Sequence, residues 1–448
     1  MSAAAHATRR VVSPAVRSFE EQFLEVQGRP IDSLSEFRDP AMQRFMALGL
    51  PSSHDESWRY TNLRSLSGIH FSAAQDHSRS DLQPFASVSL LDGAQRVATI
   101  SVVNGYPWLH SVDSVINDIE VSSLKEIARV EPAKLARFFE APSDADNRRW
   151  ALLNTALFAD GLYLKITKKV QTPLVILHVG IGSDTDTIAY PRVIIEAAPG
   201  ASATIIEHHV AQGARAVVVN SNTHIALGRG AQLEHYRVFA TGPDATHFDF
   251  LDVRQEHDSR CKQFTIALGG GMVRADMDVH LNQPGATLES QALLVGFENR
   301  HVDCVNTVTH AARDTTSRQT ARAIASDTSR VIINSKVIVN AGAVHSESQQ
   351  SCRGLLLSQA AEIDSRPQLE IHTDEVKCAH GATTGRLDPD MLFYLLSRGL
   401  DRNTAQSLLV FAFLADVLTG MSVASARAAI EDALINQMPD SQLLRNFR

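Results

Sequence analysis

The segment Thr223–Phe239, THIALGRGAQLEHYRVF, contains the pattern that decides the fold. Two runs rich in β-branched and aromatic residues, Thr223–Leu227 and Leu233–Phe239, flank a Gly230-Ala231 step. Short runs of this kind, bounded by small turn residues, are typical of β-strands. The segment therefore predicts two strands that are joined at a tight corner.

The same pattern of β-branched and aromatic runs extends from Leu162 to Ile371. Each run has roughly four to eight residues, the usual length of a strand. The further runs are Leu174–His178, Val193–Glu196, Thr204–His208, Ala216–Val219, Leu288–Val295, Val331–Asn334 and Val337–Asn340. Gly-Ala steps recur between runs, but their irregular spacing shows no repeat period. Asn-Gly and Asp-Gly pairs, which two-residue hairpins favour, are absent from this span. We therefore predict a parallel β-helix, right-handed because the hexapeptide period of left-handed β-helices is missing.

Helical patterns flank this span on both sides and predict a mainly β protein in three parts. Residues 1–160 form a mostly helical N-terminal domain, residues 161–385 the β-helix core and residues 386–448 a C-terminal helical domain. The N-terminal domain is expected to contain two helices within 15–50, helical periodicity from Val115 to Phe139 around Pro132, a helix at Trp150–Ala159 and a strand at Val97–Val103.

The C-terminal domain begins with a clear capping pattern. Asp388 suits the N-cap, Pro389 the first helical position and Gly399 the residue after the C-cap. A second helix is predicted from Asp401 to Leu418 and a third from Ser422. These helices are unusually apolar, so they need a covering surface, either their own β-helix or another protein.

Composition limits the classes of function. The chain is 44% apolar and 21% charged with a net charge of −8, which disfavours nucleic acid as a partner. No apolar stretch reaches the ~18 residues of a membrane span. The N-terminal residues 1–23 lack the apolar core of a secretory signal; their Ala, Ser and Arg content fits a transit peptide or, better, a frayed bacterial N-terminus. Four scattered cysteines without a CxxC pair predict a reduced, cytoplasmic protein.

Cys378 and His380 are the strongest candidate ligands. They follow the extended segment Gln368–His372 and lie within a predicted turn at Lys377–Gly381. If Lys377–Gly381 is extended and does not form a turn, the Cys378 and His380 side chains share one face. A thiolate beside an imidazole suits iron, zinc or copper, and Lys377 would help to lower the thiol pKa. Two ligands are only part of a site, so others must come from elsewhere in the fold or from another chain. Alternatively, both side chains simply point into the protein interior.

Other motifs do not predict catalysis. The chain contains neither GxxxxGK[ST] nor GxSxG, which disfavours a P-loop ATPase or a serine hydrolase. Most of its 18 histidines are interpreted as outward-facing strand residues. Glu207-His208-His209 is the densest group and a weak candidate for binding metal.

Several motifs together resemble the SufB/SufD family, the scaffold proteins of SUF iron–sulfur cluster assembly. They are Trp58-Arg59-Tyr60-Thr61, Pro367–Ile371, Val376–Thr383, Leu392–Leu395 and Ser397-Arg398-Gly399. The sequence is more similar to the SufD branch. SufB typically has Glu-His-Glu-Ala where this chain has Ala379–Ala382, and it often has an N-terminal cysteine cluster that this chain lacks.

The resemblance implies a non-enzymatic scaffold subunit that pairs with SufB through the β-helix and binds the ATPase SufC through the C-terminal helices. It places Cys378 and His380 near the SufB interface, as a partial metal or cluster site that SufB completes. The implied SufC-docking residues are Leu392, Phe393, Tyr394, Leu395, Arg398 and Gly399. No cofactor is expected on the isolated chain, an iron–sulfur cluster or iron would be transient, and flavin binding stays open. The alternatives are a homodimeric β-helix scaffold without a cluster role and, less favoured, a β-helix enzyme acting on polysaccharide.

Overall fold

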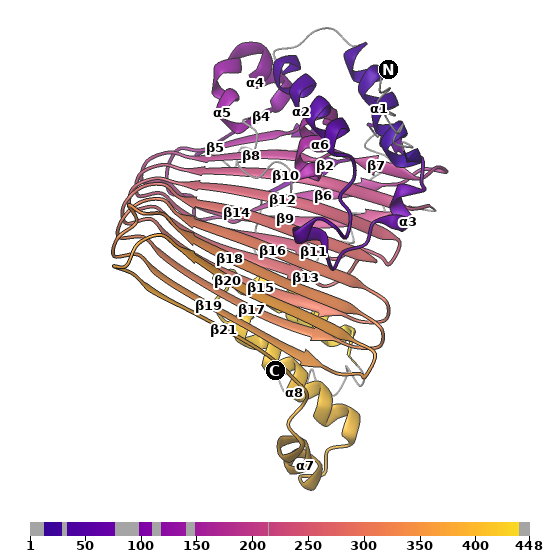
Figure 1. Cartoon of the computed structure of the whole chain (residues 1–448), viewed down its shortest axis with the longest axis vertical. Helices are drawn as coiled ribbons and strands as arrows, with labels where there is room; N and C mark the ends of the chain where they lie inside the picture. The colour runs from indigo at the N-terminus through magenta and orange to yellow at the C-terminus, as the bar shows by residue number, and fades with distance from the viewer. Residues whose placement is uncertain are drawn as a thin grey trace, which may run out of the picture.

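The structure is a computed structural model that describes residues 13–28, 34–76, 98–109, 118–139, 148–213 and 215–438 (Figure 1). Its centre is a parallel β-solenoid of about 8 turns, with helices at both ends, which confirms the predicted β-helix core between helical segments. Residues 1–12, on which the interpretation of the N-terminus depends, lie outside the described residues.

Two parallel sheets form the solenoid, and we call them sheet A and sheet B. Sheet A contains β20 (Glu362–Ile371), β18 (Arg330–Val339), β16 (His301–His310), β14 (Met272–Leu281), β12 (Ala245–Gln255), β10 (Val217–Leu227), β8 (Arg192–Ala197), β5 (Leu162–Ile166) and β4 (Ile119–Ser123), with β1 (Ser72–Ala73) and β7 (Thr187–Ala189) beside them. Sheet B contains β21 (Lys377–Gly385), β19 (Glu347–Leu356), β17 (Thr316–Ala325), β15 (Thr287–Gly296), β13 (Arg260–Ala267), β11 (Gln232–Phe239), β9 (Ser202–Gln212), β6 (Leu174–Ile181), β2 (Ala98–Val103) and β3 (Tyr106–Trp108).

The chain alternates between the sheets, so each solenoid turn contributes one strand to each. The length of a turn varies: Thr246 pairs with Met272, 26 residues later, whereas Arg330 pairs with Glu362, 32 residues later. These differences lie in the corners between strands, and they explain why the spacing of Gly-Ala steps showed no period.

Polar residues inside the solenoid account for two errors in the predicted strands. Apart from its first residue Ala216, the run Ala216–Val219 belongs with Thr223–Leu227 to the single strand β10. In the same way Val331–Asn334 and Val337–Asn340, except for Asn340, belong to β18. The residues between the runs are polar, and all except Lys336 are buried; Ser335, for example, donates a hydrogen bond to Gln319 across the interior (2.9 Å). Such residues interrupt the apolar pattern without ending the strand.

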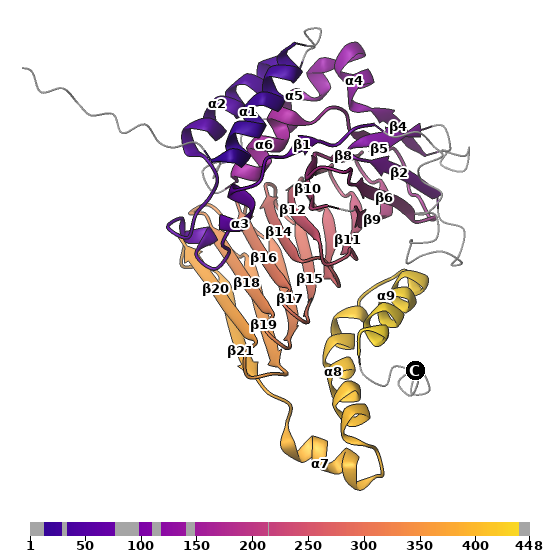
Figure 2. The same ribbon diagram turned by 90° about the vertical axis from the view of Figure 1, so that its right-hand side faces the viewer.

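The N-terminal helices cover the outer face of sheet A (Figures 1 and 2). They are α1 (Pro14–Gln27), α2 (Ser35–Leu48), α3 (Arg64–Ser67), α4 (Leu124–Val130), α5 (Ala136–Phe139) and α6 (Arg149–Leu157), with 3₁₀ turns at Glu56–Trp58 and Pro132–Lys134. Trp150 of α6 stacks on Phe248 of β12, with ring centroids 3.8 Å apart. The helical prediction for 115–139 was wrong in part, because β4 precedes α4 and pairs antiparallel with β5.

The segment Glu56–Thr61 holds these helices against sheet A. Trp58 is buried, and the Arg274 guanidinium lies over its ring at 3.7 Å from the centroid. Thr61 donates a 2.5 Å hydrogen bond to Asp303 of β16. The motif therefore packs the N-terminal segment onto the solenoid.

The C-terminal helices are α7 (Pro389–Ser397), α8 (Arg402–Leu418) and α9 (Ala424–Asn436). Asp388 caps α7 and Asp401 caps α8, and Gly399 adopts a positive φ of 88°, as the capping pattern predicted. Helices α8 and α9 bury Leu414 and Ile430 in one apolar cluster with residues of sheet B such as Phe264. Their covering surface is thus the chain's own solenoid. No helix in the described part of the chain is long and apolar enough to cross a membrane.

Candidate functional site

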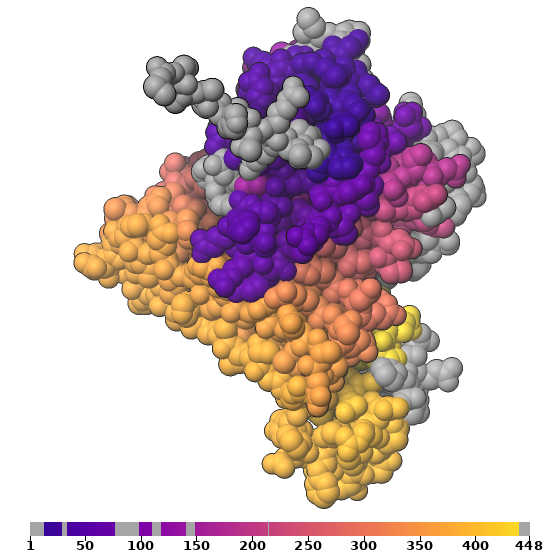
Figure 3. Space-filling view, turned by 45° about the vertical axis from the view of Figure 1, so that its right-hand side comes forward, coloured from indigo at the N-terminus to yellow at the C-terminus, as the bar shows by residue number. Residues whose placement is uncertain are grey.

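The last turn of the solenoid, formed by β20 and β21, is open. These two strands are the terminal members of sheets A and B, and no described strand pairs with their outer edges. Most residues of β21 are exposed, whereas strands in the middle of the solenoid are largely buried. The first turn differs, because antiparallel strands β3 and β4 and the N-terminal helices lie beside it. The open turn lies toward the end of the molecule that carries α7 (Figure 3).

Cys378 and His380 lie on β21 in this open turn. The prediction of a turn at Lys377–Gly381 was wrong, because these residues form an edge strand. Cys378 pairs in register with Ser348 and His380 with Gln350, and both partners are buried. Alternate residues of a strand share a face, so Cys378 and His380 point toward the solenoid interior where that interior opens to solvent.

The Cys378 thiol is half-buried and packs beside the interior apolar cluster. Burial raises its pKa, and a hydrogen bond from the Ser348 backbone N–H offsets this only in part. Lys377 points to the other face, where its ammonium binds Glu347 at 2.7 Å. The expected lowering of the thiol pKa by Lys377 is therefore wrong, and metal or sulfide chemistry at Cys378 requires loss of the thiol proton.

Within the described residues, no third His, Cys, Asp or Glu side chain completes a metal-binding group with Cys378 and His380. Cys378 and His380 therefore lie on the inner face of the edge strand β21 without further ligands from the described part of the chain. The arrangement is a pair of ligands that a second surface can complete.

Helix α7 presents an apolar surface to solvent next to the open turn. Met391, Phe393 and Tyr394 are 58%, 71% and 56% exposed, and Arg398 lies against the Tyr394 ring at 5.1 Å. Leu392 and Leu395 are half-buried, and Gly399 ends the helix. A cleft of about 410 Å³ separates α7 from the end of sheet B, lined by Leu356, Leu357, Arg386, Leu387, Pro389, Leu392, Phe393, Leu396, Arg402 and Gln406.

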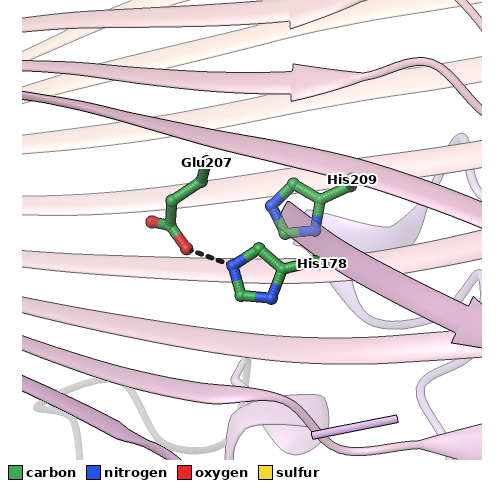
Figure 4. A group of neighbouring side chains, drawn as sticks. All are labelled: His178, Glu207 and His209. Carbon is green, nitrogen blue, oxygen red and sulfur yellow. Dashed lines mark hydrogen bonds and ion pairs between the residues drawn. The ribbon is translucent and has the colours of Figure 1, made fainter. Parts of the chain in front are cut away.

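Several histidines lie inside the solenoid, contrary to the interpretation that most face outward. His209, His235 and His247 are buried between the sheets, and His178 joins them from β6. His178 bonds one oxygen of Glu207 at 2.8 Å (Figure 4). His235 bonds the other oxygen at the same distance. His208 projects from the opposite face of β9. The alternation Glu207-x-His209, at the end of the predicted strand Thr204–His208, was the available signal, but nothing in the sequence placed His178 and His247 beside it.

Two comparisons with known families agree with this architecture. Residues 180–413 match the family described as SUF system FeS cluster assembly, SufBD core domain. Residues 16–176 match the SufBD protein N-terminal region.

Individual relatives are similar over most of their length. The iron–sulfur cluster assembly protein SufD of Escherichia coli is 28% identical, over 84% of this chain and 86% of the relative. The SufBD family protein slr0076 of Synechocystis is 26% identical over 94% and 95% of the two chains. The chloroplastic protein ABCI7 of Arabidopsis thaliana is 26% identical over 57% and 56%. The chain therefore belongs to the SufB/SufD family, as a SufD-like protein of iron–sulfur cluster assembly.

Proposed function

We propose that this chain is a non-catalytic scaffold subunit of a cytoplasmic SufB–SufC–SufD complex that assembles iron–sulfur clusters. The observation that carries the proposal is the open last turn, which presents Cys378 and His380 at an unpaired strand edge. Iron and sulfide are cargo in this scheme and not resident groups. The four cysteines form no disulfide, as suits a reducing compartment.

The open turn suits a β-solenoid partner. Unpaired N–H and C=O groups along β20 and β21 offer hydrogen bonds to a strand of another chain. A SufB subunit docked there would bring its own side chains next to Cys378 and His380. The missing ligands would then come from the partner, and the site would exist only in the complex.

The α7 surface suits the ATPase SufC. Exposed aromatic and thioether side chains beside a cleft are typical of the centre of a protein interface. The α7 helix follows β21 after three residues, 386–388. Movement of a bound ATPase would therefore act close to the open turn, where we propose that it reshapes the SufB interface and exposes Cys378 and His380.

Replacing His380 with alanine is expected to lower cluster formation by the reconstituted three-subunit complex at least tenfold, the usual scale for losing a metal ligand or its orienting group. The side chain is exposed, so the complex should still assemble. The matched control is His372→Ala, which removes another exposed histidine near the same end. Cluster formation would be followed by visible absorbance and iron content; equal rates for His380→Ala and the unchanged chain would eliminate the ligand role.

Replacing Phe393 with alanine is expected to weaken SufC binding at least tenfold, because the ring is 71% exposed at the centre of the α7 surface. Binding of SufB should be unchanged. The control is Leu24→Ala, which removes an exposed apolar side chain from α1 at the other end of the molecule. Isothermal titration calorimetry measures both affinities, and unchanged SufC binding by the Phe393 variant would rule out this docking surface.

Co-expression with the cognate SufB and SufC tests the proposal as a whole. Light scattering should give the mass of an assembly that contains all three chains. A chain that pairs only with itself would instead support the homodimeric scaffold without a cluster role.

A further inference from the structure

We propose that the solenoid interior contains a binding site for one divalent transition-metal ion of the Zn²⁺ or Fe²⁺ type, with His178, Glu207 and His209 as ligands. The site lies within this one chain, separate from the open turn. It goes beyond the scaffold function proposed above and does not depend on any partner.

The three ligands come from two neighbouring strands. His178 of β6 and His209 of β9 are register partners, and Glu207 precedes His209 by two residues, so all three side chains share the inner face. One ligand atom from each lies within 4.8 Å of the other two. Bonds of about 2.1 Å to a tetrahedral ion place ligand atoms roughly 3.4 Å apart, so the group needs only a small contraction to close on an ion.

The two imidazoles must also turn slightly. Their rings are stacked, with centroids 4.4 Å apart and planes 4° from parallel (Figure 4). A nitrogen binds metal in the plane of its ring, so one ring has to rotate about its Cβ–Cγ bond. That torsion has a broad energy profile in histidine, which makes the adjustment easy.

Unsatisfied nitrogen atoms are the second, independent observation. Both ring nitrogens of His209 and both of His247 are buried without a hydrogen-bond partner in the described part of the chain, as is Nδ1 of His178. Buried polar atoms left unpaired destabilise a fold. A metal ion beside His209 gives one of these nitrogens a partner and explains why an uncharged imidazole is retained there.

The chemistry of the three ligands also indicates the class of metal ion. Two imidazoles and one carboxylate favour Zn²⁺ or Fe²⁺ over Mg²⁺ or Ca²⁺, which prefer oxygen ligands.

Neighbouring residues support the same assignment. His247 reaches toward His209 from sheet A, with ring centroids 6.0 Å apart, and can provide a fourth ligand. His235 and Thr223 fix the carboxylate of Glu207 at 2.8 and 3.0 Å, as orienting groups commonly do around metal ligands. The three proposed ligands are at most 2% exposed, so a bound ion should exchange slowly with chelators in solution.

The test uses the full chain, unfolded with a chelator to remove metal and refolded anaerobically with Zn²⁺ alone or Fe²⁺ alone. After desalting into buffer that contains a chelator, elemental mass spectrometry should find about one metal ion per chain. Comparing the metal content after refolding with Zn²⁺ and with Fe²⁺ identifies the preferred metal. Refolding with Co²⁺ should give the visible absorption bands of a low-coordinate site. Less than a tenth of an ion per chain in every arm would overturn the proposal.

Adjacent residues provide matched variants. His209→Gln should retain less than a tenth of the metal, whereas His208→Gln should retain all of it, because His208 is equally buried but lies on the opposite face of β9. Cys378→Ser should also retain the metal, which separates this site from the open turn. Equal metal contents for the His208 and His209 variants would refute the assignment. If His209→Gln does not fold, the unchanged chain decides: a cobalt spectrum and a higher melting temperature after refolding with Zn²⁺ than after refolding without metal support the site, and absence of both refutes it.

Discussion

Replacing Asp249 with alanine is expected to lower the free energy of unfolding by about 3–5 kcal/mol, the cost of breaking a buried ion pair from one side. Asp249 and Arg237 are in contact inside the solenoid at 2.5 Å, and both side chains are 0% exposed. Arg237 also donates to the Asp276 carbonyl and the Thr265 hydroxyl. Neither group neutralises a guanidinium charge, so the variant leaves a buried cation without its counter-ion. Denaturant titration of the chain measures the change.

The double variant Arg237→Met with Asp249→Leu is the control. It removes both charges and fills the space with apolar atoms, which is often neutral or stabilising. The double variant should therefore be more stable than Asp249→Ala. A decrease in the free energy of unfolding of less than about 1 kcal/mol in Asp249→Ala, the scale of a solvent-exposed ion pair, would show that water reaches Arg237.

Acidification from pH 8 to 5.5 is expected to destabilise the metal-free chain by about 5 kcal/mol. Burial lowers the pKa to about 4 in His208, to about 3 in His247, to about 4 in His310 and well below normal in His209. These groups stay neutral in the folded chain but bind protons when it unfolds, with an ordinary pKa of about 6.5. Each therefore stabilises the fold above pH 6.5, by about 1.4 kcal/mol relative to pH 5.5, and this stabilisation is lost as pH falls toward the folded pKa.

Denaturant titrations at several pH values, with chelator present, measure this dependence. His280 opposes it weakly, since its ring N–H donates a hydrogen bond to the Asp278 carboxylate, which raises the pKa of His280. In the His208→Gln variant, unfolding should bind about one proton fewer, so the free energy of unfolding should depend less steeply on pH. Equal stability at pH 8 and pH 5.5 would contradict the assignment of these imidazoles as neutral and buried.

Local patterns in the sequence predicted the secondary structure well where each pattern was complete. Asp388, Pro389 and Gly399 defined the bounds of α7 because capping depends on residues within one turn. The β-branched runs predicted the solenoid for a similar reason, since each strand buries its own apolar residues.

The candidate sites depended on information that is not local. Cys378 and His380 could be paired from their spacing in one strand, but their position at an open turn depends on how the last solenoid turn ends. His178 and His209 are separated by a full solenoid turn, whose length varies, so their register could not be read from the sequence. The apolar pattern itself was broken by interior residues such as Ser335, because the centre of this solenoid is partly polar.

The open last turn also affects how much of this protein a cell can safely contain. A parallel solenoid has no built-in limit on its length, since every turn displays the hydrogen-bonding edge on which the next one forms. The strands β20 and β21 end this series without a covering element in the described chain. Chains made in excess of the proposed partner subunit would keep this edge exposed to one another and to other unpaired strands, which favours aggregation. If a partner covers the edge as proposed, selection should couple the synthesis of the two subunits, and unassembled copies should be removed by proteolysis.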